Sequence, residues 1–233
     1  MFFSNKIKII IILLMEITDD IRDTVYEQIK KIALNVLEKH LRGQGYYQSW
    51  AKTWGNNIIQ EIEQQFKEIF KEKYGIIIAF YMSDTTDYVS NHKCVNYSKT
   101  DFYFIVPYNT KFFFSEVRVY LTKIHSKLNN FIDFINPELS FRINQKMVEL
   151  LDRRKFNFDK MEGIVENIAI QVNNMLLEKK DMPCSYHICF INELPTKGLY
   201  FTYKVINLEY APVFCTFTTP TCACHTYLFM VNN

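Results

Sequence analysis

Hydrophobic residues recur with helical spacing in two stretches near the start of the chain. The first stretch follows the capping residues Thr18, Asp19 and Asp20 and predicts a helix that ends at Gly43 and Gly45. Its apolar positions are Ile21, Val25, Ile29, Ala33, Val36 and Leu37. The second stretch covers residues 49–73 and repeats an apolar residue every four positions, at Trp50, Trp54, Ile58, Ile62, Phe66 and Phe70. We therefore expect both tryptophans to be core residues rather than a platform for a ligand.

Four strand-like runs follow these two helices. Polar turn residues separate the runs, as in Ser83-Asp84 and Asn109-Thr110. The predicted strands are Ile76–Met82, Asp87–Asn96, Asp101–Pro107 and Phe112–Leu121. Two helices followed by four short strands predict an α+β unit with its helices on one face of an antiparallel sheet.

The same order of elements returns in the second half of the chain. Its two helical stripes are Ile143, Met147, Leu150 and Leu151, then Met161, Ile164, Val165, Ile168, Val172, Met175 and Leu176. Its strand-like runs are Tyr186–Ile191, Leu199–Leu208, Pro212–Thr218 and Cys222–Val231. The chain is therefore predicted to be an internal duplication of α+β class. Two tandem units, each of two helices on a four-stranded antiparallel sheet, are expected to form an intramolecular pseudo-dimer.

Breaks in the pattern give the boundaries of these units. We place the first unit at residues 18–124, a joint at 125–137 and the second unit at 138–233. Residues 1–17 form a leader whose apolar run resembles a signal peptide but lacks a cleavage site and is too short to span a bilayer. Met15 is an alternative start of the protein. We expect the leader to be unstructured or loosely docked.

Composition excludes several classes of partner. Apolar residues make up 48% and charged residues 22% of the chain, as in ordinary folded proteins. The net charge of +2 provides no broad basic field, so we expect no nucleic-acid binding, and the pattern predicts no membrane association. Aromatic residues reach 16% and concentrate in the strand-like runs, where they suit the faces of a sheet.

The sequence contains few residues in an arrangement that suggests catalysis, metal binding or cofactor binding. Its six cysteines are interpreted as small buried thiols in a reducing compartment. Cys222 and Cys224 would share one face of a strand and His225 the other, so we expect no metal site. Cys224 with His187 is the best candidate for a nucleophile and its base, but nothing marks a third, orienting group. With no phosphate-binding loop or His-Glu-x-x-His stretch either, we expect neither enzymatic activity nor a cofactor.

Several short features together resemble the Tctex-type dynein light chain family. In the first unit they are an aromatic residue before the second helix, Trp54-x-x-Asn57-Ile58-Ile59-Gln60, and Lys73-Tyr74 before the first strand. In the second unit they are Phe156, Asn167-Ile168, Tyr186–Ile191 and the closing strands Val213–Thr218 and Cys222–Val231. The likeness runs from about residue 18 to the end of the chain, with Ile164 in place of the tryptophan in the second unit.

The resemblance implies a non-catalytic subunit of a dynein motor in the cytoplasm and cytoskeleton, here expected in the ciliary axoneme. Its expected partners are a dynein intermediate chain, held as an added strand, and other dynein light chains, including a possible light-chain heterodimer. An alternative is a scaffold of the same fold in a ciliary or cytoskeletal complex without that contact. By likeness to the family, the third strand of each unit, near the seam between the two units, is expected to bind the partner. The candidate residues are Phe102, Phe104, Val106, Phe214, Thr216 and Thr218. In the alternative reading these side chains are core and the strand backbone binds.

Overall fold

The computed structural model describes most of the first half of the chain and the strands of the second half. The described residues are 19–70, 74–84, 89–95, 102–123, 141–145, 147–149, 184–192, 199–206, 213–218 and 222–230, with single helical positions at 163, 166, 167, 170, 171 and 174. The predicted leader and the predicted joint at 125–137 lie outside these residues.

Helix α2 (Asp19–Leu41) forms where the first apolar stripe predicts it. Five positions of that stripe are buried, namely Val25, Ile29, Ala33, Val36 and Leu37. The helix ends because Gly43 adopts a positive φ of 75°, and the Gln44 amide donates a hydrogen bond of 3.1 Å to the carbonyl of Leu41. The prediction of this helix and of its glycine end is confirmed.

Helix α3 (Gln48–Phe70) also forms as predicted, but its buried face differs from the predicted one at the N-terminal end. Trp50 is 57% exposed and Trp54 is half-buried, so the expectation that both are core residues is wrong for Trp50. Each four-residue step turns by about 40° beyond a full helical turn. Over several steps that drift carries Trp50 off the buried face, which Ala51 and Gly55 take over instead.

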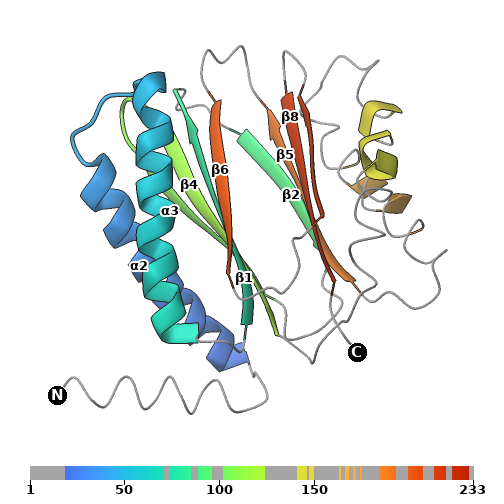
Figure 1. The fold of residues 1–233 in the computed structure, drawn as a ribbon, viewed down its shortest axis with the longest axis horizontal. Coiled ribbons are helices and arrows are strands. Elements are labelled where there is room, and N and C mark those ends of the chain that lie inside the picture. The colour runs from blue at the N-terminus through green and yellow to red at the C-terminus, as the bar shows by residue number, and fades with distance from the viewer. Residues whose placement is uncertain are drawn as a thin grey trace.

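The strands form two four-stranded antiparallel sheets (Figure 1). The first sheet has the order β3-β4-β1-β6, and the second sheet has the order β2-β5-β8-β7. The strands of the first half are β1 (Tyr74–Ser83), β2 (Val89–Val95), β3 (Phe102–Asn109) and β4 (Phe114–Lys123). Those of the second half are β5 (Cys184–Asn192), β6 (Leu199–Ile206), β7 (Val213–Thr218) and β8 (Cys222–Met230). All eight lie where the sequence predicted strands.

Each sheet takes one strand from the other half of the chain. Strand β6 pairs with β1 from Ile76–Ile206 to Ser83–Leu199, whereas β2 leaves the first half and pairs with β5. The expectation that each half builds a sheet from its own four strands is therefore wrong. A strand-forming sequence favours an extended conformation but does not specify which strand pairs with it. Here the central strand β1 pairs with β6, which lies more than a hundred residues later in the chain. We call this arrangement the strand exchange.

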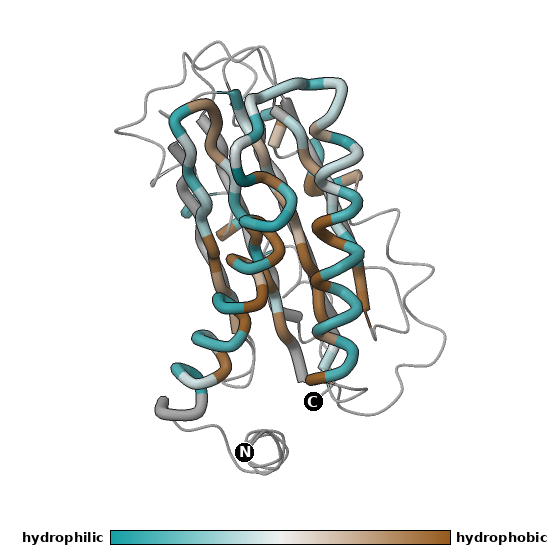
Figure 2. The backbone as a smooth tube through the Cα atoms, turned by 90° about the vertical axis from the view of Figure 1, so that its left-hand side faces the viewer, coloured by the Kyte–Doolittle hydropathy of each residue, from teal (hydrophilic) through white to brown (hydrophobic). Residues whose placement is uncertain are grey.

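Helices α2 and α3 cover one face of the first sheet, and the second sheet lies on the other side of it (Figure 1). Hydrophobic and hydrophilic positions alternate along both helices, as amphipathic helices require (Figure 2). The core beneath them includes Ile58, Ile62, Phe66, Ile78 and Phe80. The face of the first sheet away from the helices, here called the inner face, is also buried along its central strand. That strand contributes Ile77, Ala79 and Tyr81.

Short helical segments are described in the second half. Residues 141–145 and 147–149 are helical, and Ile143 and Met147 are fully buried, as their predicted stripe requires. Leu150, Leu151 and the second predicted stripe lie outside the described residues.

Candidate partner-binding site

Strand β3 forms one outer edge of the first sheet. It pairs with β4 along its whole length, from Phe102–Leu121 to Asn109–Phe114, and the order of the described strands places none on its other side. An outer edge presents backbone N–H and C=O groups that another extended chain can pair with. The predicted third-strand site therefore lies at a sheet edge.

The predicted side chains of β3 do not face that edge. Phe102, Phe104 and Val106 are all buried in the core, and the ring of Phe104 stacks on that of Tyr26 of α2 at 5.3 Å between centroids. These three side chains hold α2 against the sheet. These three side chains are therefore part of the hydrophobic core. At the outer edge of the sheet, β3 exposes backbone groups rather than these side chains.

Pro107 indicates which backbone groups of β3 point outward. Proline lacks an N–H and occurs within sheets where that N–H would face solvent rather than the neighbouring strand. Because alternate residues of an edge strand direct their N–H groups to opposite sides, Tyr103 and Ile105 share the outward direction of Pro107. The backbone N–H of Ile105 therefore points away from β4, toward the outer edge of the sheet.

Strand β7 occupies the equivalent outer edge of the second sheet. It pairs with β8, and its residues Phe214, Thr216 and Thr218 stand opposite Tyr227, His225 and Ala223. These three predicted site residues therefore share one face of the sheet. Their side chains lie outside the described part of the structure.

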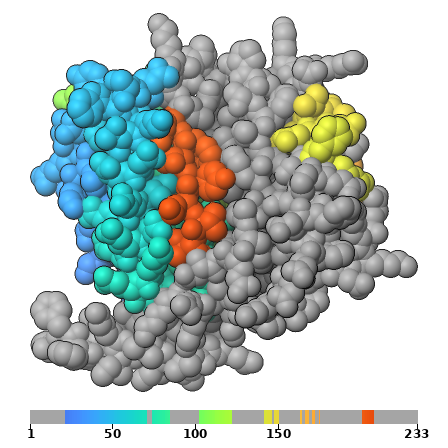
Figure 3. Space-filling model, in the orientation of Figure 1, coloured from blue at the N-terminus to red at the C-terminus, as the bar shows by residue number. Residues whose placement is uncertain are grey.

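The exchanged strand β6 lies directly against α3 on the surface of the molecule (Figure 3). The contact depends on Gly55, because a Cβ atom at that position would lie 2.3 Å from Cε1 of Tyr200 and 3.0 Å from Cδ1 of Phe80. The Tyr200 hydroxyl donates to the backbone oxygen of Lys52 or to Oδ1 of Asn56, each at 3.4 Å. Gly55 thus lets a strand of the second half dock under a helix of the first.

The inner face carries a buried ion pair at the middle of β4. Arg118 contacts Oε1 of Glu116 through both Nε and Nη2, and both residues are buried. The guanidinium carbon of Arg118 lies 4.5 Å from the centroid of the Tyr81 ring. Burial strips water from both charges, so each depends on its protein contacts.

A second charged cluster joins α2 to α3. Lys39 Nζ lies 2.8 Å and His40 Nε2 lies 2.9 Å from Oε2 of Glu61. Hydrogen bonds, first from Lys39 and then from His40, hold the pKa of the Glu61 carboxyl below its usual value of 4.5. The carboxylate therefore fastens the C-terminal end of α2 to the middle of α3.

We expect Glu61→Gln to lower the free energy of unfolding at neutral pH by about 1 kcal/mol or less, because the cluster is partly exposed. A carboxyl whose folded pKa is depressed stabilises the fold above its unfolded pKa and loses that contribution as the pH falls through the folded value. The variant should therefore lose less stability than the wild type on acidification below about pH 5. Denaturant unfolding at a series of pH values measures this. Glu38→Gln, which removes an exposed ion pair with Arg42, should leave the decrease in the free energy of unfolding at acidic pH unchanged.

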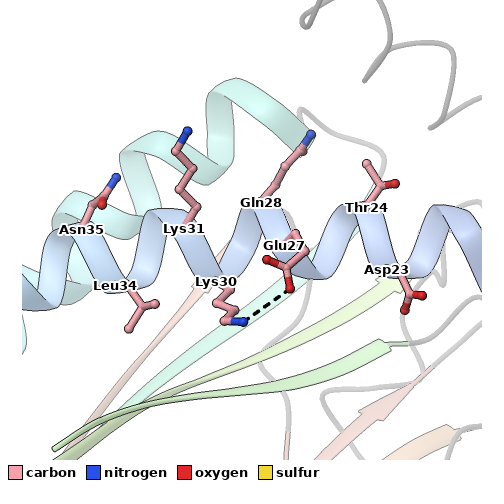
Figure 4. Close-up of a pocket in the computed structure, with 8 residues that line it drawn as sticks. All are labelled: Asp23, Thr24, Glu27, Gln28, Lys30, Lys31, Leu34 and Asn35. Carbon is pink, nitrogen blue, oxygen red and sulfur yellow. Dashed lines mark hydrogen bonds and ion pairs between the residues drawn. The ribbon is translucent and has the colours of Figure 1, made fainter.

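A shallow hollow of about 730 Å³ runs along α2 (Figure 4). Its described lining is Asp23, Thr24, Glu27, Gln28, Lys30, Lys31, Leu34 and Asn35. These side chains leave the helix on different sides, and Glu27 pairs with Lys30 at 3.4 Å. Charges of both signs that diverge from one helix do not define a binding site.

Among the side chains that the structure describes, no group of three or more His, Cys, Asp or Glu residues is placed to hold a metal ion. The described helices include none that is long and apolar enough to cross a membrane.

Two helices on one face of a four-stranded antiparallel sheet, whose outer edge at β3 has no further strand among the described residues, define an α+β module suited to strand addition. Residues 23–122, which contain α3, β1–β3 and most of α2 and β4, match the model of the Tctex-1 family, so this segment of the chain is similar to that family. No curated protein matches the chain.

Proposed function

We propose that this protein is a non-catalytic dynein light chain that binds an extended segment of a dynein intermediate chain and helps to assemble an axonemal motor. The observation that carries this proposal is the position of β3 at the outer edge of the first sheet, with no described strand on its other side, within the segment that matches the family. Partner binding there requires no catalytic group and no cofactor. The bound segment would add a fifth strand next to β3 and pair with its outward backbone groups, that of Ile105 among them.

The strand exchange supports a second part of the proposal. Strand β6 completes the first sheet and β2 completes the second, so each half supplies the strand that the other lacks. In our proposal the two halves are duplicated units that make within one chain the dimer that single light chains make from two. Such a chain would have two strand edges for partners, β3 and β7, and would not require another light chain for pairing.

Recovery of partners from the native cell tests the motor assignment. A tagged chain is used for a pulldown, and the bound proteins are quantified by mass spectrometry. Dynein heavy and intermediate chains in amounts comparable to the bait are expected. Other cytoskeletal proteins without any dynein chain would assign the protein to a scaffold role with the same fold. The mass of the purified chain in solution is expected to be that of one chain, and a stable dimer would contradict pairing within the chain.

We expect Ile105→Pro to weaken binding of the recovered intermediate-chain segment by about fivefold, because it removes an outward backbone donor worth about 1 kcal/mol. The ladder between β3 and β4 should survive, since the existing Pro107 has the same direction in the strand. Ile105→Thr is the matched control, because threonine keeps the β-branch and the N–H. Calorimetric titration of both variants with a synthetic segment measures the difference. Equal affinities for the two variants would place the partner elsewhere.

A further inference from the structure

Helix α2 and strand β3 run in the same direction along the edge that we propose for partner binding. The guanidinium carbon of Arg22 lies 6.0 Å from the centroid of the Phe102 ring, and the Tyr26 ring stacks on that of Phe104 at 5.3 Å. Four residues of a helix rise by about 6 Å, and two residues of a strand rise by about 6.6 Å. Each turn of α2 therefore stays in step with every second residue of β3.

Four residues of α2 form a row beside this edge, and we call them the α2 row. They are Arg22, Tyr26, Lys30 and Leu34, which follow one another at steps of four residues. The Nζ atom of Lys30 lies 5.5 Å from the centroid of the Tyr26 ring, so neighbouring members of the row are in contact there. Lys30 and Leu34 leave the helix on the same side (Figure 4). Cationic and apolar side chains therefore alternate along this side of α2.

The α2 row is accessible to a partner, in contrast to the side chains of β3 beneath it. Arg22 is exposed, and the other three members of the row are partly exposed, whereas Phe102, Phe104 and Val106 are buried. A strand added to β3 would direct every second side chain to the same face of the sheet as these three residues. Those side chains of the partner would follow the α2 row at nearly the same spacing.

Two carboxylates near the row restrict the register of a bound segment. Glu27 pairs with Lys30 at 3.4 Å, but the exposed fractions of their side chains, 66% and 41%, leave this pair well screened by solvent. An acidic side chain of a partner can therefore compete for Lys30. Asp23 directly follows Arg22 in the sequence. A segment shifted by two residues would move its acidic side chains away from both cations of the row, toward a region where Asp23 and Glu27 oppose negative charge.

We propose that the α2 row selects extended partner segments in which acidic and apolar side chains alternate at every second residue. The inference rests on the proposed function, because it requires a segment that pairs with β3. Acidic side chains of the segment would pair with Arg22 and Lys30, and apolar ones would pack beside Tyr26 and Leu34. The preferred segment thus has the form acidic-x-apolar-x-acidic-x-apolar along the direction of β3, where x faces the other side of the sheet.

The test uses the full-length chain and a synthetic copy of the intermediate-chain segment recovered with it. We expect Lys30→Glu to weaken binding of this segment by about tenfold at low ionic strength, with a smaller loss at high salt. Replacing the acidic residues of the segment by Asn and Gln should lower its affinity by a similar factor. Lys31→Glu is the matched control, because Lys31 is an exposed lysine that leaves α2 on another side (Figure 4), and it should leave the affinity unchanged.

An exchange of charges provides the most specific result. A segment whose acidic residue opposite Lys30 is replaced by lysine should bind the Lys30→Glu variant at least about fivefold more tightly than it binds the wild type. Circular dichroism shows whether each variant folds. Arg22→Glu changes an exposed side chain of the same row and provides the same comparison if Lys30→Glu unfolds.

A bound segment without alternating acidic and apolar residues would overturn this inference, and so would equal losses of affinity in Lys30→Glu and Lys31→Glu. The inference and the proposed function can fail separately. If Ile105→Pro weakens binding and Lys30→Glu does not, the segment pairs with β3 but the α2 row does not select it. If neither substitution changes the affinity, or no segment is recovered, the proposed site at β3 is wrong and the inference fails with it.

Discussion

Arg118→Met is expected to lower the free energy of unfolding by about 3–5 kcal/mol, which is a large part of the stability of an ordinary domain. The substitution leaves the Glu116 carboxylate buried on the inner face without the guanidinium beside it. It also removes the contact of that guanidinium with the Tyr81 ring. Denaturant unfolding followed by circular dichroism measures the loss.

The double variant Glu116→Leu with Arg118→Met distinguishes charge from packing. When both charges are replaced by apolar side chains of similar size, the change in stability should be small and can even be favourable. A double variant as unstable as the single one would show that shape at the centre of the inner face matters more than charge. Arg42→Met provides the exposed comparison and should change stability by less than about 0.5 kcal/mol.

Gly55→Leu is the second substitution with a large expected effect, a loss of about 3 kcal/mol or more. The new side chain would occupy the space of Tyr200 and Phe80, where even a Cβ atom is too close. Gly55→Ala should cost less, because alanine favours the helix by about 1 kcal/mol and so offsets part of the overlap. The same unfolding measurement applies to both variants.

Two further variants serve as controls for this packing argument. Gly163 is helical, and a Cβ atom added there would have no neighbouring atom within 4 Å, so Gly163→Ala should be neutral or stabilising by up to about 1 kcal/mol. Tyr200→Leu should recover much of the loss in Gly55→Ala, because it removes the nearest ring atom. A double-mutant cycle over Gly55 and Tyr200 with no coupling would mean that β6 does not depend on this glycine.

Local pattern predicted the elements of this fold well. The apolar stripe from Val25 to Leu37 has helical spacing, whereas the run from Ile76 to Met82 is continuously apolar, and the structure confirms the helix and the strand. The same reasoning placed Trp50 in the core, because a spacing of four residues was treated as one face although the helix turns slightly further at each step.

The hydrophobic pattern could not predict which strands pair with each other. The sequence of Val89–Val95 is compatible with a strand in either sheet, because a strand-forming sequence does not specify which strand it pairs with. The third-strand site was placed at an edge by resemblance alone, and burial of Phe102 and Phe104 then reduced it to the backbone. Whether that edge binds a partner stays a prediction.

The strand exchange also governs the order in which the protein can be completed during synthesis. When β1 has left the ribosome, the strand that belongs beside it at residues 199–206 has not yet been made. Until then the first sheet has a buried central strand with one open edge, a state that favours association with other chains. The second sheet has the reverse situation, because β2 is finished early and waits for β5. Neither half can therefore be separated from the other by truncation, because a cut between them would take one strand away from each sheet.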